Sequence, residues 1–300
     1  MIKYVLHKDL DIIKYDNCIA SSINSRIYAF SWYLNCVADN WDVLVYGDYE
    51  AVMPIPKRQK YLINYVYTPF WITQLGVFFN TNKVDSNSIL LIDFLEKLKE
   101  KFKIIDIRLN TENQIKNYNS KFLLERFNYE LSLKTDYQSI YDNYKKDRKK
   151  SLKKASNNHL IEKWNDSAIK LIEIFKNNIG LRTPNIKEID YRNLSVLVDI
   201  CFKKKVGKII EVYDSDRELT SAAFILKNKR RVTILVSSTD FKNRNNGTNT
   251  FLIDAIIKKY ANQDLIFDFG GSSIPGIASF FRSFGATKKV YYNFNQKKIL

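Results

Sequence analysis

The sequence predicts an α+β fold with a mixed sheet, arranged as two similar units in tandem. A short strand, two helices, a strand meander, a helix and a further strand follow one another twice along the chain. The 300 residues, 45% of them hydrophobic, are enough to bury two ordinary cores. Because no identical sequence repeat accompanies this order, the shared architecture is what indicates a duplicated fold. We place the boundary after residue 130, which gives domains 1–130 and 131–300.

In the first unit, residues 2–6 predict a strand, and residues 15–39 predict two short helices interrupted near 24–28. Residues 41–46 and 49–56 predict a hairpin, because Gly47 and Asp48 tolerate the positive φ of a tight turn. Strands are expected at 63–67 and 74–79. An amphipathic helix over 86–101, capped by Ser86 or Ser88, precedes a strand over 104–109.

In the second unit, residues 137–155 predict one long basic helix, followed by a strand over 159–162. Helices are expected over 167–179 and 187–205. Three strands, over 208–213, 219–226 and 231–238, form a second meander. A helix over 248–260, a strand over 265–269, a helix over 274–284 and a strand over 290–294 complete the unit.

Charge narrows the class of partner. Lys and Arg number 48 against 32 Asp and Glu, a formal net charge of +16. Such a surface attracts polyanions such as tRNA, a nucleotide, a diphosphate lipid or, by peripheral contact, an acidic membrane. Compositional drift toward Lys explains the same excess without any partner.

Cysteine usage and hydropathy indicate a cytoplasmic, soluble protein. The three cysteines are far apart and form neither a disulfide framework nor a metal-ligand motif. No stretch approaches the roughly 18 consecutive apolar residues of a membrane span. We therefore expect no transmembrane segment and no metal.

The strand-to-helix junction over residues 231–260 is the most informative stretch. The strand ends near Ser238, a polar loop contains Arg244, and Gly247 and Thr248 open a helix, followed by Asn249. Amide groups at a helix N-terminus bind phosphate, and a glycine allows the close approach of a ligand. The alternative is an ordinary turn, which is what most glycines at such junctions make. These five residues form the predicted cofactor-binding set.

This loop resembles the Arg/Gln-x-x-Gly-x-Gly/Ala loop that holds the pyrophosphate of coenzyme A in the GNAT acyltransferase superfamily, with Asn249 in place of its second small residue. Residues 281–285, Phe-Arg-Ser-Phe-Gly, are similar to the Phe-Lys-x-x-Phe-Gly signature of FemABX-type peptidyltransferases. Ordinary GNAT enzymes commonly have a tyrosine acid where Phe281 stands. The basic stretch 147–155 resembles the helix that opens the second domain of Fem-like proteins, so the resemblance covers about residues 135–295.

The resemblance implies two GNAT-like units, with a donor site in the second and a supporting or acceptor-binding role for the first. It places Phe281 and Arg282 at the catalytic position, where Arg282 would hold a phosphate or offset an oxyanion. A solvated surface arginine is the alternative. Residues expected to bind substrate are Tyr67, Gln74, Arg148, Lys149, Asp268 and Ser272. For Asp268 the alternative is a turn cap, for Tyr67 and Gln74 a core strand, and for Arg148 and Lys149 a solvated helix face.

Three hypotheses follow. In the first, an acyltransferase moves an acyl or aminoacyl group to an amine, with acyl-coenzyme A or aminoacyl-tRNA as a co-substrate and no permanently bound cofactor. In the second, the protein is a small-molecule N-acetyltransferase that uses acetyl-coenzyme A. In the third, it is a non-catalytic protein that binds a polyanion through its basic face.

Overall fold

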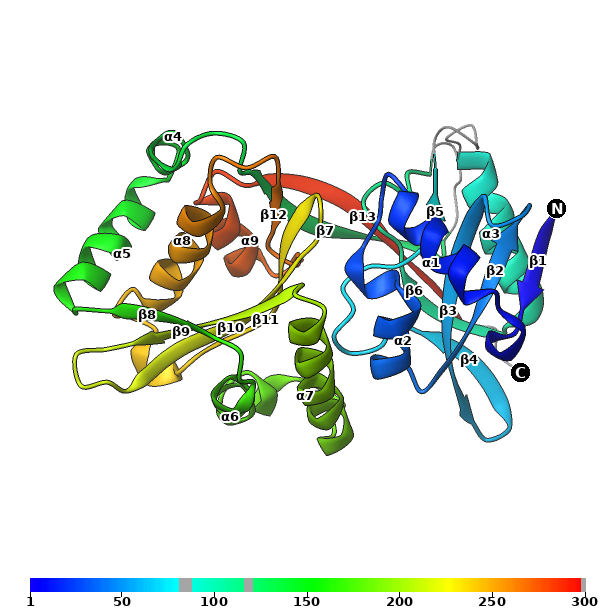
Figure 1. Ribbon diagram of the computed structural model, residues 1–300, viewed down its shortest axis with the longest axis horizontal. Helices are drawn as coiled ribbons and strands as arrows, with labels where there is room; N and C mark the ends of the chain where they lie inside the picture. Colours follow the sequence, from blue (N-terminus) through cyan, green and yellow to red (C-terminus); the bar gives the residue numbers. More distant parts are fainter. Residues whose placement is uncertain (81–87, 116–120, 298–300) are drawn as a thin grey trace. The chain divides into compact units, whose positions relative to one another are not determined.

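The computed structural model describes residues 1–80, 88–115 and 121–297 (Figure 1). The chain divides into two compact units, Met1–Phe127 with Val290–Leu300, and Asn128–Lys289. The sequence-based division after residue 130 assigned the last segment to the second unit, whereas its contacts group it with the first.

The first unit has its strands in the order β1-β2-β3-β4-β6-β13, with β5 added to β3. Helices α1 and α2 lie on one face of this sheet and α3 on the other (Figure 1). Its elements are β1 (Ile2–Val5), η1 (His7–Asp9), α1 (Ile12–Ser21), η2 (Ile27–Ala29), α2 (Ser31–Val37), β2 (Asn40–Tyr46), β3 (Ala51–Lys60), β4 (Ile63–Tyr67), β5 (Phe78–Phe79), α3 (Ser88–Lys101) and β6 (Ile104–Arg108).

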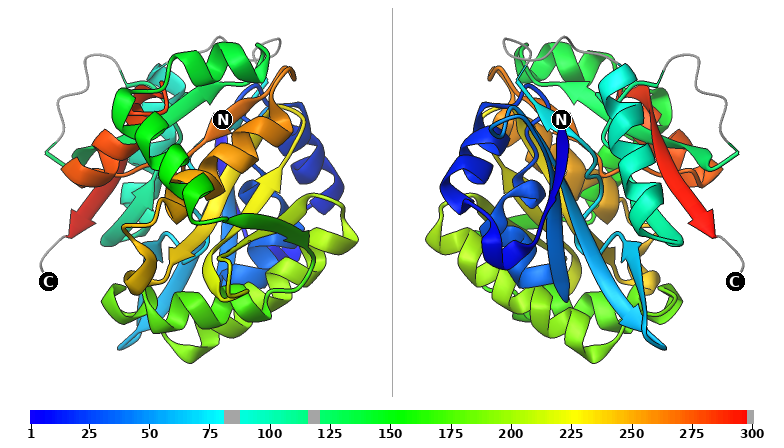
Figure 2. Two further views of the ribbon diagram at one scale, coloured as in Figure 1. Left: turned by 90° about the vertical axis from the view of Figure 1, so that its left-hand side faces the viewer. Right: turned by 90° about the vertical axis from the view of Figure 1, so that its right-hand side faces the viewer.

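The second unit has the strand order β7-β12-β11-β10-β9-β8. Helices α6 and α7 cover one face of its sheet, and α8, with α5 packed on it, covers the other (Figures 1 and 2). Its elements are α4 (Tyr137–Asp142), α5 (Lys146–Asn157), β8 (Ile161–Asn165), α6 (Ile169–Asn177), η3 (Gly180–Arg182), α7 (Glu188–Lys203), β9 (Gly207–Tyr213), β10 (Leu219–Lys227), β11 (Arg231–Thr239), η4 (Phe241–Asn243), α8 (Thr248–Tyr260), β12 (Ile266–Asp268) and α9 (Pro275–Arg282).

The two units share one topology. In the first, the antiparallel meander β2-β3-β4 leads through α3 to β6, which pairs in parallel with β4. In the second, β9-β10-β11 leads through α8 to β12, which pairs in parallel with β11. A meander followed by one helical crossover to a parallel strand is the repeated architecture that the sequence predicted.

The units exchange their last strands. Strand β7 (Leu123–Ser132) follows the first unit in sequence but pairs antiparallel with β12 of the second, Asp268 lying opposite Glu130. Strand β13 (Thr287–Lys297) follows the second unit but pairs antiparallel with β6 of the first, from Asn293↔Arg108 to Lys297↔Ile104. The chain therefore crosses between the units twice, within β7 and within β13.

Apolar strands and helix stripes fill each core. In the first unit, Trp41, Phe78 and Phe94 are fully buried, and in the second, Phe224 and Phe267 are. In the part of the chain that the structure describes, no helix has the length and the apolar character that a membrane crossing needs.

Two sequence-based expectations are corrected. The helix expected over 137–155 is broken, because Tyr144 turns inward against Phe284, with ring centroids 5.1 Å apart, and the Lys145 amide donates to the Ser283 carbonyl at 2.9 Å. The domain boundary expected after residue 130 lies within strand β7, which runs without a break through that point. Ser86, one of two caps expected for the helix now called α3, lies outside the described residues.

The β3–β4 turn gives a first prediction. Lys60 pairs with Ile63, and the two residues between them, Tyr61 and Leu62, have φ values of 48° and 65°. Their side chains are 86% and 90% exposed, so little packing offsets the left-handed backbone. We expect the double substitution Tyr61→Asn/Leu62→Gly to raise the free energy of unfolding by roughly 1 kcal/mol in denaturant titrations. A lower value would mean that the two exposed side chains stabilise the hairpin.

Candidate functional site

The strands β11 and β12 part soon after they meet. They pair in parallel only from Arg231↔Ile266 to Thr233↔Asp268, and β11 then continues to Thr239. On its other side, β11 has a bulge, since Phe224 pairs with Val236 and Ile225 with Ile234, which leaves Leu235 as an extra residue. A bulge bends a strand and increases its twist. From Ile234 onward, β11 has no ladder partner on the β12 side among the described strands.

Helix α8 begins beside this split. Its N-cap, Gly247, has φ 90°, and the side chain of Asn246 accepts a hydrogen bond from the Thr248 amide at 3.1 Å. The next two amides, of Asn249 and Thr250, have no acceptor among the hydrogen bonds of the described residues. Unpaired amides and the helix dipole make this first turn electropositive, as the sequence predicted for an anion site.

Helix α5 packs directly against Gly247. A Cβ at this position would collide with the carbonyl oxygen of Ser151 and lie 3.1 Å from the Ala155 nitrogen. The Asn158 side chain donates to the Asn246 carbonyl at 3.0 Å. The glycine is therefore required by the approach of α5 and by its own φ, and this packing fixes the loop.

Two of the predicted cofactor-binding side chains hold the loop from inside. The Ser238 hydroxyl is buried and donates to the Ile174 carbonyl at 3.1 Å, which ties β11 to α6. The Thr248 hydroxyl is also buried, 2.6 Å from the Thr220 hydroxyl and 3.1 Å from that of Ser221. Contact of either side chain with a cofactor stays a prediction. Asn249, which was also predicted to bind the cofactor, is half-buried in the first helical turn.

Two arginines lie over one aromatic ring in this loop. The guanidinium carbon of Arg244, a predicted site residue, is 3.7 Å from the Phe241 ring centroid, and that of Arg182 is 4.2 Å from it. The Phe241 amide donates to the Asn178 side chain at 2.8 Å, which anchors the ring to the end of α6. Sequence reasoning missed Arg182, because nothing near it in the chain connects it with residue 244.

Arg148 and Lys149, both predicted to bind substrate, point to different places. Arg148 donates to the Thr250 hydroxyl at 2.7 Å and lies over the Phe280 ring at 4.7 Å, so it joins the start of α8. Lys149 donates to the Asp142 carbonyl at 3.0 Å and lies near the Tyr141 ring, on the side of α4. The structure therefore brings only Arg148 to the predicted anion site.

Helix α9 carries the predicted catalytic pair. The half-buried Phe281 packs against Phe269 and Tyr129, with ring centroids 4.9 and 5.9 Å away. Arg282 is exposed and has no ion pair within the described part of the chain. The Ser272 hydroxyl accepts a hydrogen bond from the Ile274 amide at 3.1 Å, just before the helix. Phe281 thus supports the aromatic core, and Arg282 offers an unpaired cation.

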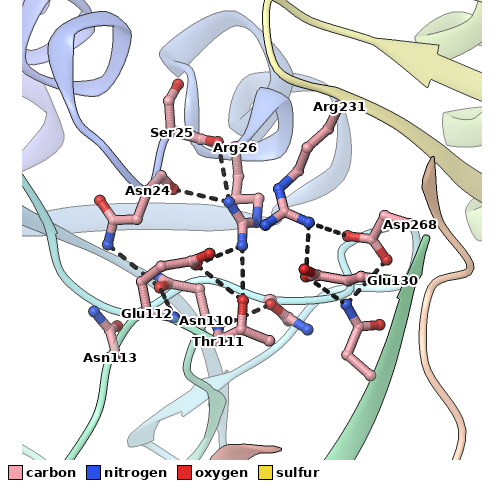
Figure 3. A network of polar contacts seen from close by, with 12 residues as sticks. Asn24, Ser25, Arg26, Asn110, Thr111, Glu112, Asn113, Glu130, Arg231 and Asp268 are labelled. Atoms are coloured by element: carbon pink, nitrogen blue, oxygen red, sulfur yellow. Dashed lines mark hydrogen bonds and ion pairs between the residues drawn. The ribbon is translucent and has the colours of Figure 1, made fainter. Parts of the chain in front are cut away.

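Asp268 belongs to a buried charge cluster at the base of the split (Figure 3). It is 1% exposed and accepts hydrogen bonds from the Gly270 amide at 2.9 Å and from Asn128 at 3.1 Å. Arg231 lies 2.7 Å from Glu130 and 3.4 Å from Asp268. The bond to Gly270 is the turn cap considered as an alternative, and Arg231 and Glu130 were missed because their sequence neighbours carry no motif.

Comparison with known proteins gives the fold. No family model matches the sequence, and no curated protein matches it. Among solved structures, FemX has a TM-score of 0.66 at 11% identity, over 97% of this chain and 96% of that one. A tandem GNAT protein from the clavulanic acid biosynthesis pathway has a TM-score of 0.53 at 8% identity, over 98% of both chains.

The chain has a tandem GNAT-like fold. A third structure, the C-terminal domain of a putative lysylphosphatidylglycerol synthetase from Agrobacterium fabrum, has a TM-score of 0.57 at 10% identity, over 96% of this chain and 92% of that domain. The predicted fold class and the predicted resemblance to GNAT and Fem-like proteins are confirmed. Identities this low support the fold and leave the reaction to be argued from the site.

The first GNAT-like unit holds the other two predicted substrate residues. The Tyr67 hydroxyl donates to Asp39 at 3.2 Å and its ring lies 4.2 Å from the guanidinium carbon of Arg58. Burial raises the pKa of Tyr67 to about 12. This tyrosine is therefore neutral at physiological pH and serves as a hydrogen-bonding group.

Gln74 is 1% exposed and its side chain accepts from the Thr111 amide at 3.2 Å. Thr111 in turn accepts from the buried Arg26 at 3.0 Å, and Arg26 also pairs with Glu112 at 2.6 Å (Figure 3). Gln74 thus belongs to a polar cluster inside the first GNAT-like unit, built on the loop that follows β6.

Glycine substitutions test how the anion site is built. We expect Gly247→Ala to lower the free energy of unfolding by at least about 1 kcal/mol, because it combines a left-handed backbone with a clash against α5. Gly276→Ala, on α9, is the matched control, since a Cβ there meets nothing within 4 Å. It should be neutral or stabilising by up to about 1 kcal/mol. Equal effects of the two substitutions in urea titrations would contradict the packing argument.

Asp254 on α8 gives a pH-dependent prediction. It is 8% exposed, accepts from the Tyr137 hydroxyl at 3.0 Å through both carboxylate oxygens, and faces Tyr144, Lys258 and Glu162. Burial raises its pKa, even though the hydrogen bonds from Tyr137, the nearby Tyr144 hydroxyl and the charge of Lys258 oppose the rise. The folded state therefore binds the proton more tightly than the unfolded state, whose pKa is about 3.9.

This order of pKa values sets the direction in which the free energy of unfolding changes with pH. The stabilising contribution of protonated Asp254 is complete below about pH 3.9 and is lost as the pH rises through the folded-state pKa. Asp254→Asn removes this loss, so the stability of the variant relative to the parent should increase across that window and stay constant above it. Unfolding titrations from pH 3.5 to 7 measure the difference. A relative stability that falls with rising pH would show that Tyr137 and Tyr144 favour the anion.

Proposed function

We propose that the protein is an acyltransferase, which moves an acyl or aminoacyl group from an activated ester to an amine acceptor. The observation that carries the proposal is the split between β11 and β12 beside the electropositive start of α8, within a GNAT-like fold. A phosphate-bearing donor would bind at the amides of Asn249 and Thr250, near Arg148 and Arg244. Its carbonyl would lie along the free edge of β11.

The proposed reaction does not require a nucleophilic side chain, because the acceptor amine is the nucleophile. The acceptor amine attacks the donor carbonyl, a tetrahedral oxyanion forms, and the thiol or ribose hydroxyl leaves as the amine loses a proton. Backbone N–H groups of β11 beyond Ile234 that point away from β10 are the proposed donors to the oxyanion, and Arg282 would supply a cation. Positioning and electrostatics would account for most of the rate enhancement.

The donor is acyl-coenzyme A or aminoacyl-tRNA. A small-molecule N-acetyltransferase using acetyl-coenzyme A is the narrower form of the same proposal. The second candidate function, polyanion binding without turnover, is favoured by α5, where Lys146, Lys150, Lys153 and Lys154 are exposed and have no ion pair among the described residues. Such a row of lysines suits a phosphate backbone.

A thermal shift titration with acetyl-coenzyme A tests the proposal. At a hundred times its Kd, the ligand should add about 2.7 kcal/mol of stability. Arg244→Ala should weaken binding about tenfold or more, because a charge-assisted hydrogen bond contributes about 1.5–3 kcal/mol. Arg192→Ala, an exposed arginine on α7, is the control and should leave the shift unchanged.

Transfer is then measured with each donor. Free thiol release from acetyl-coenzyme A in the presence of an amine panel reports one, and amine-dependent deacylation of aminoacyl-tRNA reports the other. Turnover that Arg282→Ala lowers would support the proposal. Saturable binding of RNA with no transfer from either donor would reject it in favour of a polyanion-binding protein.

A further inference from the structure

The arginine pair on Phe241 is a second cationic feature of the donor side, and it joins Arg244 of the glycine loop to Arg182, which is distant from that loop in sequence. Arg182 ends η3, after α6, and Arg244 follows η4, after β11. The two guanidinium carbons lie 4.2 and 3.7 Å from one ring centroid. Phe241 itself is held by Asn178, and the Asp240 side chain caps η4 through the Lys242 amide at 2.9 Å. The ring is thus a fixed support for two cations.

The pair carries two like charges without a counterion. Because both lie over one ring, the two guanidinium carbons are no more than about 8 Å apart, which is the Debye length at physiological ionic strength. Among the described residues, neither arginine has a carboxylate partner, whereas Arg26, Arg58 and Arg231 each have one. Contact with the ring offsets part of the repulsion, by about 0.5–1 kcal/mol for each exposed cation. An anion that contacts both cations would remove the rest.

We propose that Arg182 and Arg244, supported by Phe241, form a phosphate clamp for the activated donor. This inference rests on the proposed function for its ligand and deepens it by adding Arg182 as a specificity-determining residue. A guanidinium binds phosphate through two parallel hydrogen bonds, and a flat aromatic support keeps its plane in one orientation. Two guanidinium groups suit a phosphomonoester, which carries two negative charges, better than they suit a group that carries one.

The clamp and the start of α8 make two phosphate positions. The amides of Asn249 and Thr250 with Arg148 form the first, and Arg244 on the preceding turn forms the second together with Arg182 of η3. A donor with phosphates at separate points of the molecule would engage both. Coenzyme A, with a pyrophosphate and a 3′-phosphate, has that chemistry, and so does the terminal part of an RNA strand.

Calorimetric titration with four probes tests the clamp: coenzyme A, 3′-dephospho-coenzyme A, adenosine 3′,5′-bisphosphate and a short single-stranded RNA. We expect Arg182→Ala and Arg244→Ala each to weaken the binding of coenzyme A about tenfold, which corresponds to about 1.4 kcal/mol. Arg182→Lys should recover only part of the loss, because an ammonium cannot bind in the two-bonded geometry. Phe241→Leu should weaken binding as well, by releasing both arginines. Arg192→Ala is the matched control.

The probes separate the two sources of phosphate. If Arg182→Ala weakens coenzyme A but leaves 3′-dephospho-coenzyme A unchanged, the clamp holds a terminal phosphomonoester. If it weakens RNA alone and lowers the salt dependence of RNA binding, the clamp holds a backbone phosphodiester. Either result supports the clamp. Unchanged binding of all probes by Arg182→Ala, or no binding of any probe to the parent protein, overturns it.

The test also distinguishes the clamp from the proposed function. Binding is measured without turnover, so loss of binding in Arg182→Ala together with an absence of transfer would support the clamp and reject the acyltransferase. Transfer that Arg182→Ala leaves unchanged, in kcat and in the KM for the donor, would support the enzyme and reject the clamp. Melting temperatures equal to the parent's, expected for exposed arginines, establish that the variants fold.

Discussion

Two buried carboxylates that face each other across paired strands set the geometry of the second unit. Glu130 on β7 and Asp268 on β12 are register partners, and directly opposed like charges destabilise a sheet. Arg231, which starts β11, reaches both and makes their burial tolerable. Removing one member would leave an uncompensated buried charge, which costs far more than the cluster contributes when it is intact. The cluster thus fixes three strands together at the one end where β11 and β12 are paired.

From that fixed end, the rest of the candidate site follows step by step. Strand β11 is held beside β12 for three residue pairs, and the extra residue Leu235 then bends it away, which opens the split. The loop beyond β11 is tied to α6 through Ser238 and Phe241, and helix α5 closes on Gly247 from the other side. Two of these residues, Ser238 and Gly247, were predicted from the sequence to bind a cofactor. In the folded chain, both fix the loop that carries the proposed binding groups.

Local patterns predicted most elements and the glycine loop, because strand alternation, helical stripes and a strand-glycine-helix junction are written in consecutive residues. Helix α8 was predicted with its observed bounds. What failed depends on contacts between distant parts of the chain. The break before Lys145 results from its bond to Ser283, the continuity of β7 from its pairing with β12, and the place of Arg182 from the Phe241 ring. None of these partners is adjacent in sequence, so no periodicity reveals them.

The positively charged side chains of the second unit are therefore of two kinds, exposed lysines and arginines held on aromatic rings. Four lysines of α5, Lys146, Lys150, Lys153 and Lys154, are exposed and have no ion pair among the described residues. Lysines of this kind give an affinity for polyanions that depends on salt. The arginines near α8 are different, because Arg148 lies over Phe280 while Arg182 and Arg244 share Phe241. A planar cation on an aromatic ring keeps its direction, so it can select one phosphate geometry over another. A basic composition alone does not imply this. The ring-supported arginines therefore agree better with the proposed donor site than with a surface that only attracts negative charge.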